Sequence, residues 1–217
     1  MSNRDVILVG GGGNCKVILE LLKETDYNPI GLLEPSMKVG ETFFGVECLG
    51  SDDEAPRLLA EGVQQAIITP AMPCTLKRRL TELYLGIGFT IPTLVSSSAI
   101  ISSSASIGEG TCVFPGANIG PDVRIGRHCT VNVSAVITHG VTIGDYSNIA
   151  PNSTILGFNE IGAGTLIGAG GVIIQCHAIG TNSIVGAGSV VTHDVADNEV
   201  VVGNPARHMR FQRGIDE

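Results

Sequence analysis

The sequence predicts a small α/β domain followed by a left-handed parallel β-helix built from hexapeptide repeats, and three observations lead to this fold class. The 217 residues include 29 glycines but only six Phe, three Tyr and no Trp, which suits a narrow, tightly wound β structure. Ile or Val recurs at every sixth position from Val95 to Val191 without a gap. Before Val95, strand-like and helix-like segments alternate. We therefore expect two domains, residues 1–94 and residues 95–217.

The first domain should contain a small parallel sheet, because its apolar and amphipathic segments alternate. Four short apolar segments are expected as strands: residues 5–9, 29–33, 65–69 and 89–94. Three amphipathic segments between them are expected as helices: residues 15–25, 52–61 and 75–85. Ser51 is the expected N-cap of the second helix.

A run of four glycines, Gly10–Gly13, follows the first expected strand and forms a turn into the next helix. Backbone N–H groups at such a turn, together with the start of the helix, are suited to binding a phosphate. The dinucleotide fingerprint G-x-G-x-x-G fails at its last position, which is Cys15, so no NAD site is expected. A mononucleotide-type phosphate site and a tight turn without a ligand both remain open.

The hexad repeat is the strongest signal in the chain. Seventeen successive Ile or Val residues in one register have a chance probability on the order of 10⁻¹² at the frequency of these residues. Six residues per side with a tight turn between sides give a triangular coil, in which the Ile and Val side chains point inward and stack on the next coil. The repeat region therefore predicts a prism of about 5.4 coils.

Charge is scarce along this prism. Between His128 and Thr192 only Asp145 and Glu160 are charged. A prism surrounded by water should carry more charge than this. We therefore expect much of its outside to be buried against other copies of the chain, most simply in a cyclic homotrimer. The net charge of -8 argues against a nucleic-acid partner.

Other gross features limit the location and the cofactors. No apolar run reaches the ~18 residues of a membrane helix, so no membrane insertion is expected. The N-terminus lacks the apolar region of a signal peptide, so a cytoplasmic protein is expected. The six cysteines form no C-x-x-C pair and the five histidines no H-x-x-x-x-H pair, so no metal site is expected.

The order of these features resembles a known family. An α/β domain, an insertion-free hexapeptide prism and the segment Gly203-Asn204-Pro205-Ala206-Arg207 are similar to the bacterial sugar acetyltransferases, which include nucleotide-amino-sugar N-acetyltransferases and sialic acid O-acetyltransferases. The resemblance covers essentially the whole chain. It implies a Rossmann-like first domain, an acetyl-CoA donor bound between neighbouring prisms of a trimer, and a histidine base that acts on an amine or hydroxyl of the acceptor.

A catalytic histidine is the first residue role that the resemblance implies. His139 matches the base, and Asn132 matches a polar residue one coil side earlier. An imidazole with an ordinary pKa can take a proton from an amine at neutral pH. The residue after the base is usually acidic and orients the imidazole, but here it is Gly140. We therefore expect a backbone carbonyl or a residue of an adjacent chain to orient the ring.

Four other histidines compete with His139 on the sequence alone. His128 is expected on a solvated corner, and His177 occupies a normally small, inward position. His193 lies three coils after His139, too far to share a small site within one chain, and His208 lies in the tail. No Ser or Cys stands beside His139 in a way that suggests an acyl-enzyme, so direct transfer is expected.

The resemblance also implies residues that bind the donor. Asn148 stands where the family usually has a second histidine, which contacts the thioester end of acetyl-CoA. Ala169 and Ala187 match positions whose backbone contacts the pantetheine arm. Gly157 lies where close approach of the donor leaves no room for a side chain.

Gly12, Gly13, Asn14 and Glu34 are the residues that the resemblance implies for binding the acceptor. Asn14 replaces a histidine that contacts the sugar nucleotide, and Pro35 replaces the usual acidic neighbour of Glu34. A nucleotide-linked amino sugar is favoured as acceptor. The alternatives are O-acetylation of a sialic-acid-like sugar and a non-catalytic trimeric scaffold. The metal-dependent carbonic anhydrases that share the prism need histidine ligands that this chain does not offer.

Overall fold

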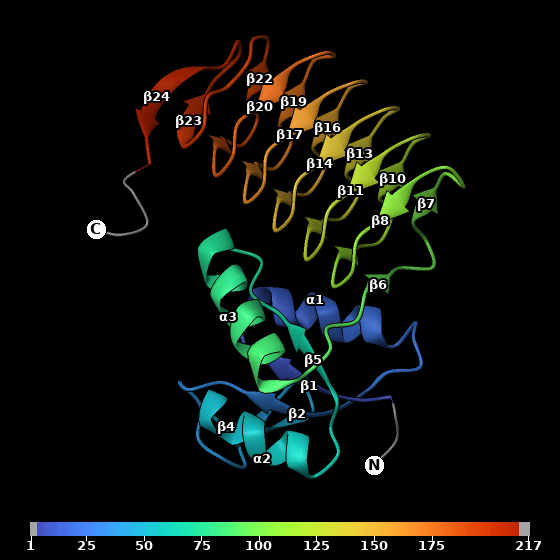
Figure 1. Ribbon diagram of the computed structural model, residues 1–217, viewed down its shortest axis with the longest axis vertical. Coiled ribbons are helices and arrows are strands. Elements are labelled where there is room, and N and C mark those ends of the chain that lie inside the picture. The colour runs from blue at the N-terminus through green and yellow to red at the C-terminus, as the bar shows by residue number, and fades with distance from the viewer. Residues whose placement is uncertain (1–3, 213–217) are drawn as a thin grey trace. The chain divides into compact units, whose positions relative to one another are not determined.

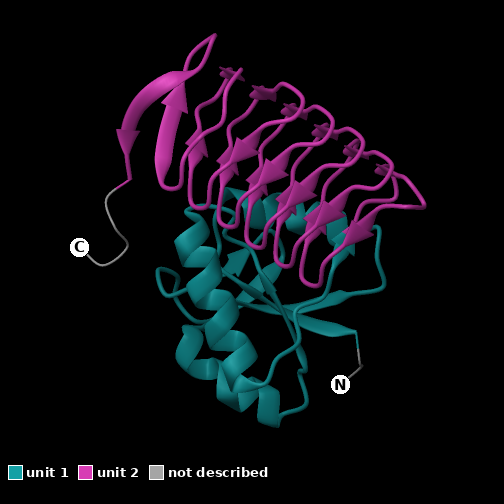
Figure 2. Cartoon of the chain, turned by 45° about the horizontal axis from the view of Figure 1, so that its top comes forward, with its two compact units in different colours: residues 1–94 teal, residues 95–217 magenta. Residues whose placement is uncertain are grey.

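The computed structural model describes residues 4–212 and divides the chain into two units, Met1–Leu94 and Val95–Glu217 (Figure 2). Among the described residues, no helix is both long enough and apolar enough to cross a bilayer. Each unit has its own hydrophobic core.

The first unit contains a sheet with the strand order β3-β4-β2-β1-β5 (Figure 1). Its strands are β1 (Asp5–Val9), β2 (Asn28–Leu33), β3 (Thr42–Phe43), β4 (Val46–Gly50) and β5 (Gln65–Ile68). Its helices are α1 (Gly13–Leu22), the 3-10 helix η1 (Asp52–Glu54), α2 (Ala55–Ala60) and α3 (Cys74–Ile87). All neighbours pair in parallel except β3 and β4. The central strand β1 is almost fully buried, which explains its uninterrupted apolar sequence.

The parallel sheet and three of its strands, β1, β2 and β5, are confirmed. The strand expected at residues 89–94 was wrong: Thr90 makes only an isolated bridge with Gln65. Helix α1 begins two residues before the expected start, directly in the glycine run. Ser51 caps η1, where its side chain accepts a hydrogen bond from the Asp53 N–H.

The second unit is a three-sided prism, and each side is a sheet of short strands that are parallel except for the last strand of side 1, β24 (Figure 1). Side 1 contains β6 (Leu94–Val95), β9 (Cys112–Val113), β12 (Thr130–Val131), β15 (Asn148–Ile149), β18 (Leu166–Ile167), β21 (Ile184–Val185), β23 (Glu199–Val202) and β24 (Arg207–Phe211). Side 2 contains β7 (Ile100–Ile101), β10 (Asn118–Ile119), β13 (Val136–Ile137), β16 (Thr154–Ile155), β19 (Val172–Ile173) and β22 (Val190–Val191). Side 3 contains β8 (Ser106–Ile107), β11 (Arg124–Ile125), β14 (Thr142–Ile143), β17 (Glu160–Ile161) and β20 (Ala178–Ile179).

The hexad residues fill the inside of this prism. Strands one coil apart pair in register, so that Ile119, Ile137 and Ile155 stack along side 2. Branched side chains from all three sides form one continuous core. The stacked parallel sheets fit a left-handed β-helix, which confirms the predicted fold class. The antiparallel strand β24 pairs with β23 and ends the prism.

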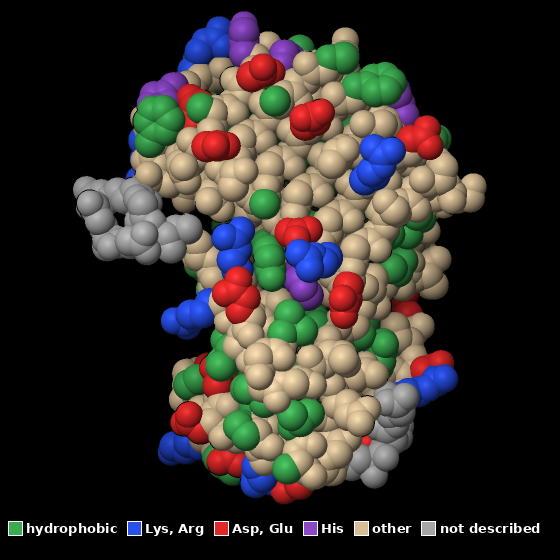
Figure 3. All heavy atoms as spheres, in the orientation of Figure 1, with side chains coloured by type: hydrophobic (Ala, Val, Ile, Leu, Met, Phe, Trp, Pro, Cys, Tyr) green, Lys and Arg blue, Asp and Glu red, His purple; other side chains and the backbone are tan. Residues whose placement is uncertain are grey.

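The strand residues that precede the hexad residues point outward, because side chains alternate along a strand. On side 2 most of these residues are apolar: Ile100, Asn118, Val136, Thr154, Val172 and Val190. On side 3 they are mainly polar: Ser106, Arg124, Thr142, Glu160 and Ala178. Over the prism, Figure 3 shows charged side chains scattered among a largely uncharged surface.

Candidate active site

The corners of the prism carry most of the residues that the sequence singles out. His139 follows β13 on side 2 and precedes β14 on side 3, so it lies at the corner between these sides. Gly157 and Phe158 lie at the same corner one coil later, after β16. We call this the His139 corner. The imidazole of His139 is exposed there.

Glycine and phenylalanine surround the imidazole. A side chain at Gly157 would place its Cβ 2.4 Å from the His139 Nε2, so the ring rests directly on this glycine. The Phe158 ring meets the His139 ring edge to face, with centroids 4.9 Å apart and planes at 79°. The Phe158 N–H also donates to the His139 carbonyl at 3.1 Å. The next coil, through Gly157 and Phe158, thus fixes the position of His139.

The single chain tests only part of what was expected to orient His139. A backbone carbonyl or an adjacent chain was expected to replace the acidic residue missing at Gly140. Within residues 4–212, neither ring nitrogen of His139 has a hydrogen-bond partner. The space that a Cβ at Gly140 would need is filled by Phe158, whose Cδ1 would lie 2.7 Å away. Within the chain, the ring of Phe158 therefore takes the position of the missing acidic side chain and contacts the imidazole.

A second group lies at the corner between sides 1 and 2. Asn132 follows β12, Ala169 follows β18 and Ala187 follows β21. Ala169 and Ala187 are exposed, and their N–H groups have no acceptor within the described part of the chain. The Asn132 carboxamide oxygen accepts the Val133 N–H at 2.8 Å. Two unpaired amides at this spacing can bind the carbonyl groups of an extended ligand.

Asn148 lies on the outer face of side 1, on β15, and is 5 % exposed. In a three-sided coil, side 1 is opposite the corner between sides 2 and 3. The structure therefore separates Asn148 and the Asn132 corner from His139 within one chain. Of the expected prism residues, only Gly157 lies beside His139, whereas Asn132, Ala169 and Ala187 share the other corner.

The other histidines have different surroundings. His128 was expected on a solvated corner, but it is 4 % exposed and stacks on Tyr146 with ring centroids 5.2 Å apart. His177 Nδ1 lies 3.0 Å from Asp194, whose carboxylate accepts the Ala178 N–H. That backbone hydrogen bond, together with His177, lowers the pKa of Asp194. These contacts tie His177 into its coil.

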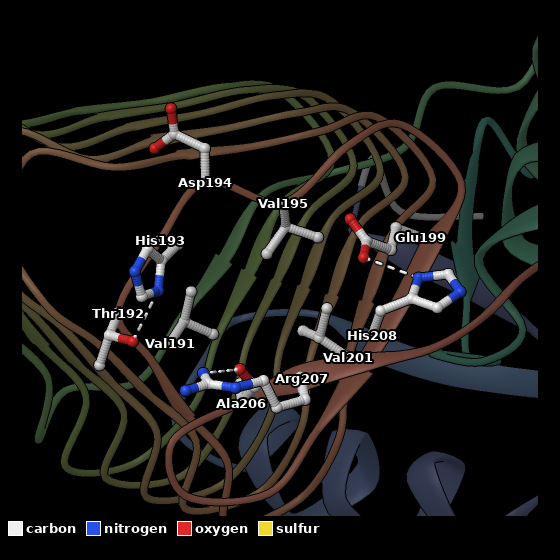
Figure 4. Close-up of a pocket in the computed structure, with 10 residues that line it drawn as sticks. All are labelled: Val191, Thr192, His193, Asp194, Val195, Glu199, Val201, Ala206, Arg207 and His208. Atoms are coloured by element: carbon white, nitrogen blue, oxygen red, sulfur yellow. Dashed lines mark hydrogen bonds and ion pairs between the residues drawn. The ribbon is translucent and has the colours of Figure 1, made fainter.

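The end of the prism forms a pocket of about 360 Å³, three coils from His139 (Figure 4). The floor of this pocket is apolar and its two rims are polar. The apolar residues are Val191, Val195 and Val201. One rim carries His193 and Asp194, and the other carries Glu199 and His208. His208 lies 2.8 Å from Glu199 and His193 lies 2.9 Å from Thr192. None of the expected site residues lines this pocket, so it is separate from the His139 corner.

In the first unit, the glycine turn lies where the strand order changes direction. β1 has β2 on one side and β5 on the other. The turn after β1, Glu34 after β2 and Thr69 after β5 therefore share one edge of the sheet. Ligands of α/β sheets bind at such a point, outside the carboxyl ends of the strands.

The four residues expected to bind the acceptor are at this edge. Gly12 and Gly13 are exposed, and a Cβ at either would meet nothing within 4 Å. The Asn14 side chain donates to the Thr69 carbonyl at 2.6 Å. The Glu34 carboxylate accepts from the Gly11 N–H at 2.7 Å and from the Ser36 hydroxyl at 2.7 Å.

These hydrogen bonds determine the charge at the turn. Partial burial acts to raise the pKa of Glu34, but the donors Gly11 and Ser36 outweigh it and hold this pKa below its ordinary value. Burial raises the pKa of the Cys15 thiol to about 11, so Cys15 is protonated at neutral pH.

Packing does not explain the glycines of this turn. Gly12 and Gly13 have neither a packing partner nor a left-handed backbone that would require glycine.

Among the described residues, no group of three or more His, Cys, Asp or Glu side chains is placed to hold a metal ion. The side chains at both sites are instead suited to hydrogen bonding and proton transfer.

No protein-family model matches the chain. The bifunctional protein GlmU of Mycolicibacterium smegmatis is 31 % identical over 104 residues, which cover 48 % of this chain. The matched segment spans only 20 % of that protein.

Solved structures match over nearly the full length. A mutant of perosamine N-acetyltransferase from Caulobacter crescentus, in complex with CoA and GDP-perosamine, has a TM-score of 0.91 and 28 % identity, covering 95 % of this chain and 97 % of its own. The acetyltransferase domain of PglB from Neisseria gonorrhoeae, in complex with acetyl coenzyme A, has a TM-score of 0.86 and 27 % identity, covering 96 % and 100 %. The chain is thus similar, over both units, to hexapeptide-repeat nucleotide-sugar acetyltransferases, as its sequence indicates.

Proposed function

We propose that this chain is an acetyltransferase that moves the acetyl group of acetyl-CoA to the amine of a nucleotide-linked amino sugar, with His139 as the general base. The observation that carries the proposal is the exposed imidazole of His139, fixed on Gly157 at a corner of a hexapeptide prism. Solved structures that match both units hold CoA with GDP-perosamine, or acetyl coenzyme A.

His139 acts on the acceptor in a direct transfer. As the amine nitrogen forms a bond to the acetyl carbon, an unprotonated ring nitrogen of His139 takes the amine proton. The carbon–sulfur bond of the thioester breaks, and the CoA thiolate leaves and takes up the proton from the His139 imidazolium, which restores the neutral base. A base of this kind accelerates transfer by about 10²–10⁴-fold, and positioning of the two substrates supplies further rate.

The donor is a substrate that the reaction consumes. The unpaired N–H groups of Ala169 and Ala187 suit the amide carbonyls of its pantetheine arm. Asn148 would donate a hydrogen bond to the thioester carbonyl, as the usual histidine does, but its side chain is only 5 % exposed within one chain, so this contact requires a change in its surroundings. Gly157 leaves the space beside the imidazole free of a side chain. Asn132 lies at the same corner as Ala169 and belongs to the same site.

In this proposal, one unit binds the acceptor and the other carries out acetyl transfer. Residues 1–94 bind the nucleotide of the acceptor, with Gly12, Gly13 and Asn14 at the start of α1 and Glu34 beside them. Open N–H groups at a helix start favour a phosphate. Residues 95–217 carry out acetyl transfer. The reaction takes place in the cytoplasm, where acetyl-CoA is available.

The assembly in this proposal is a cyclic homotrimer. His139 and Asn148 lie on opposite sides of one prism, so a site that uses both needs two chains. The outward residues of side 2 from Val136 to Val190 are uncharged and only partly exposed. An apolar face of this kind suits contact with a second copy.

The release of free CoA from acetyl-CoA, measured with a panel of UDP-, GDP- and dTDP-linked amino sugars, tests the function. We expect turnover with at least one acceptor. The His139→Ala variant should lose at least about a hundredfold in acetyl transfer while its affinity for acetyl-CoA stays nearly unchanged. His193→Ala, at the same corner three coils later, is the matched control and should keep its activity. Retained turnover in His139→Ala would refute the assignment of the base.

Thermal unfolding separates the remaining alternatives. Acetyl-CoA at a hundred times its Kd should stabilise a binding protein by about 2.7 kcal/mol, whereas a scaffold should not respond. Stabilisation without turnover on any amino sugar would instead favour O-acetylation of a sugar hydroxyl.

A further inference from the structure

Two rings and two glycines cross-pack at the His139 corner. The sequence places His139-Gly140 on one coil and Gly157-Phe158 at the same positions of the next coil. The imidazole rests on Gly157, and the phenyl ring rests on Gly140. The two rings then meet edge to face, with centroids 4.9 Å apart. Each glycine makes room for the ring of the neighbouring coil.

Within one chain, Phe158 buries little of its ring. Its side chain is 62 % exposed, although a phenyl ring normally gains stability by burial. Its backbone has φ 59°, a left-handed conformation that bulky residues rarely adopt. The next residues along this column are Cys176 and Asp194, so the prism itself does not require an aromatic side chain here. The ring contact of Phe158 is with His139.

Within its own chain, the imidazole has no other contact of this kind. Within the described residues it has no hydrogen-bond partner that fixes its ring plane. The edge-to-face geometry of two aromatic rings corresponds to roughly a 2- to 10-fold preference for the paired orientation. The ring of Phe158 also occupies the space that a side chain at Gly140 would take.

We propose that Phe158 is a positioning residue that holds the His139 imidazole in its orientation, in the place of the side chain that Gly140 lacks. This inference rests on the proposed function of His139 as base. Gly140 is part of the same arrangement, because any side chain there would displace the phenyl ring.

Kinetics of Phe158→Ala are the first test. We expect kcat to fall about tenfold, with KM for acetyl-CoA and for the acceptor unchanged within about twofold. Phe158→Tyr keeps the ring and should restore kcat. Cys176→Ala, at the same position one coil later, is the matched control. A raised KM for the acceptor with unchanged kcat would overturn the proposal, because Phe158 would then contact the acceptor.

A second substitution makes the test specific. Gly140→Asp in the native chain should lower kcat, because its Cβ would lie 2.7 Å from the Phe158 ring. In the Phe158→Ala background the same substitution should raise kcat, because space is now free and a carboxylate can accept a hydrogen bond from the imidazole. The backbone of Gly140 has φ 65°, a left-handed conformation that Asp tolerates better than most residues, so Gly140→Asn serves as the control for backbone strain. A purely structural role for Phe158 predicts two losses that add, and that result would overturn the proposal.

The ring-proton resonances of His139 give a readout without activity. In the native protein the edge-to-face contact should shift them through the ring current of Phe158, and Phe158→Ala should abolish this shift while Cys176→Ala retains it. If His139→Ala remains active, the proposed function fails, whatever the resonances show. If His139→Ala is inactive but Phe158→Ala changes neither kcat nor the resonances, only the role of Phe158 is refuted.

Discussion

At the scale of single residues, Gly157 decides where the imidazole of His139 can stand. A Cβ at this position would lie 2.4 Å from the ring nitrogen Nε2. We expect Gly157→Ala to displace the ring and to lower acetyl transfer by about a hundredfold, since errors of about 1 Å in position have effects of this size. Free CoA release measures the loss. Gln175→Ala, one coil later at the same corner, should remain active, and equal activity of both variants would contradict the placement.

Glu34 makes the first unit sensitive to acid. Its carboxylate accepts hydrogen bonds from Gly11 and Ser36, and its pKa in the folded chain is lowered. A lowered pKa stabilises the fold above the ordinary value for Glu, and this stabilisation is lost as the pH falls through the lowered value. Glu34→Gln should therefore reduce the free energy of unfolding by about 1 kcal/mol at pH 7.

At pH values below the lowered pKa, Glu34→Gln and the native chain should unfold at nearly the same urea concentration. Glu82→Gln, on the exposed face of α3, is the control and should match the native chain at both pH values. A loss in Glu34→Gln that is the same at both pH values would show that the carboxylate charge is not involved.

Sequence reasoning reached part of the site at this scale. Gly157 follows His139 by one coil, and the structure places the two together. Phe158 was missed, although the same spacing puts it above Gly140, because periodicity alone does not show which outward side chains meet. The exposure of His128 was also misjudged, because a corner position does not reveal whether neighbouring rings cover it.

At the scale of elements, the coils approach one another most closely at glycine corners. A Cβ at Gly162 would lie 2.5 Å from the backbone nitrogen of Thr181 on the next coil, and backbone cannot move aside as a side chain can. We expect Gly162→Ala to reduce the free energy of unfolding by more than about 2 kcal/mol.

Gly86 provides the contrasting case. It lies within α3, where a Cβ would meet nothing within 4 Å. Gly86→Ala should stabilise the chain by up to about 1 kcal/mol, because alanine has the higher helix propensity. Urea unfolding followed by circular dichroism measures both variants, and similar effects of the two substitutions would contradict the close approach at Gly162.

The elements themselves could be predicted to different extents. The hexads place the prism strands directly, since each Ile or Val marks one inward position. The hairpin β3–β4 was not foreseen, because its turn, Phe44-Gly45, has positive φ at both residues without the usual Asn or Asp. Residues 89–94 look like a strand because they are apolar, but Phe89 and Ile91 are buried without a ladder.

At the scale of the whole molecule, the scarcity of charge and the placement of the site lead to the same assembly. The sequence alone pointed to a homotrimer through the low charge between His128 and Thr192. The proposed site points the same way: if it uses both the His139 corner and the corner of Ala169, it needs two chains, because these corners are different edges of one prism. Which chain contributes which corner could not be read from the sequence, since the repeat looks the same on all three sides.

A mixture of two inactive variants tests whether sites are shared between chains. His139→Ala removes the base, and Ala169→Trp blocks the other corner with a bulky, exposed side chain. If each site takes its base from one chain and its donor-binding corner from the next, about a quarter of the sites in a fully exchanged equal mixture combine two intact corners. Acetyl transfer should therefore recover to about a quarter of the native rate, although each variant alone is inactive. Light scattering should give the mass of three chains, and a mixture that exchanges subunits without regaining activity would place the whole site within one chain.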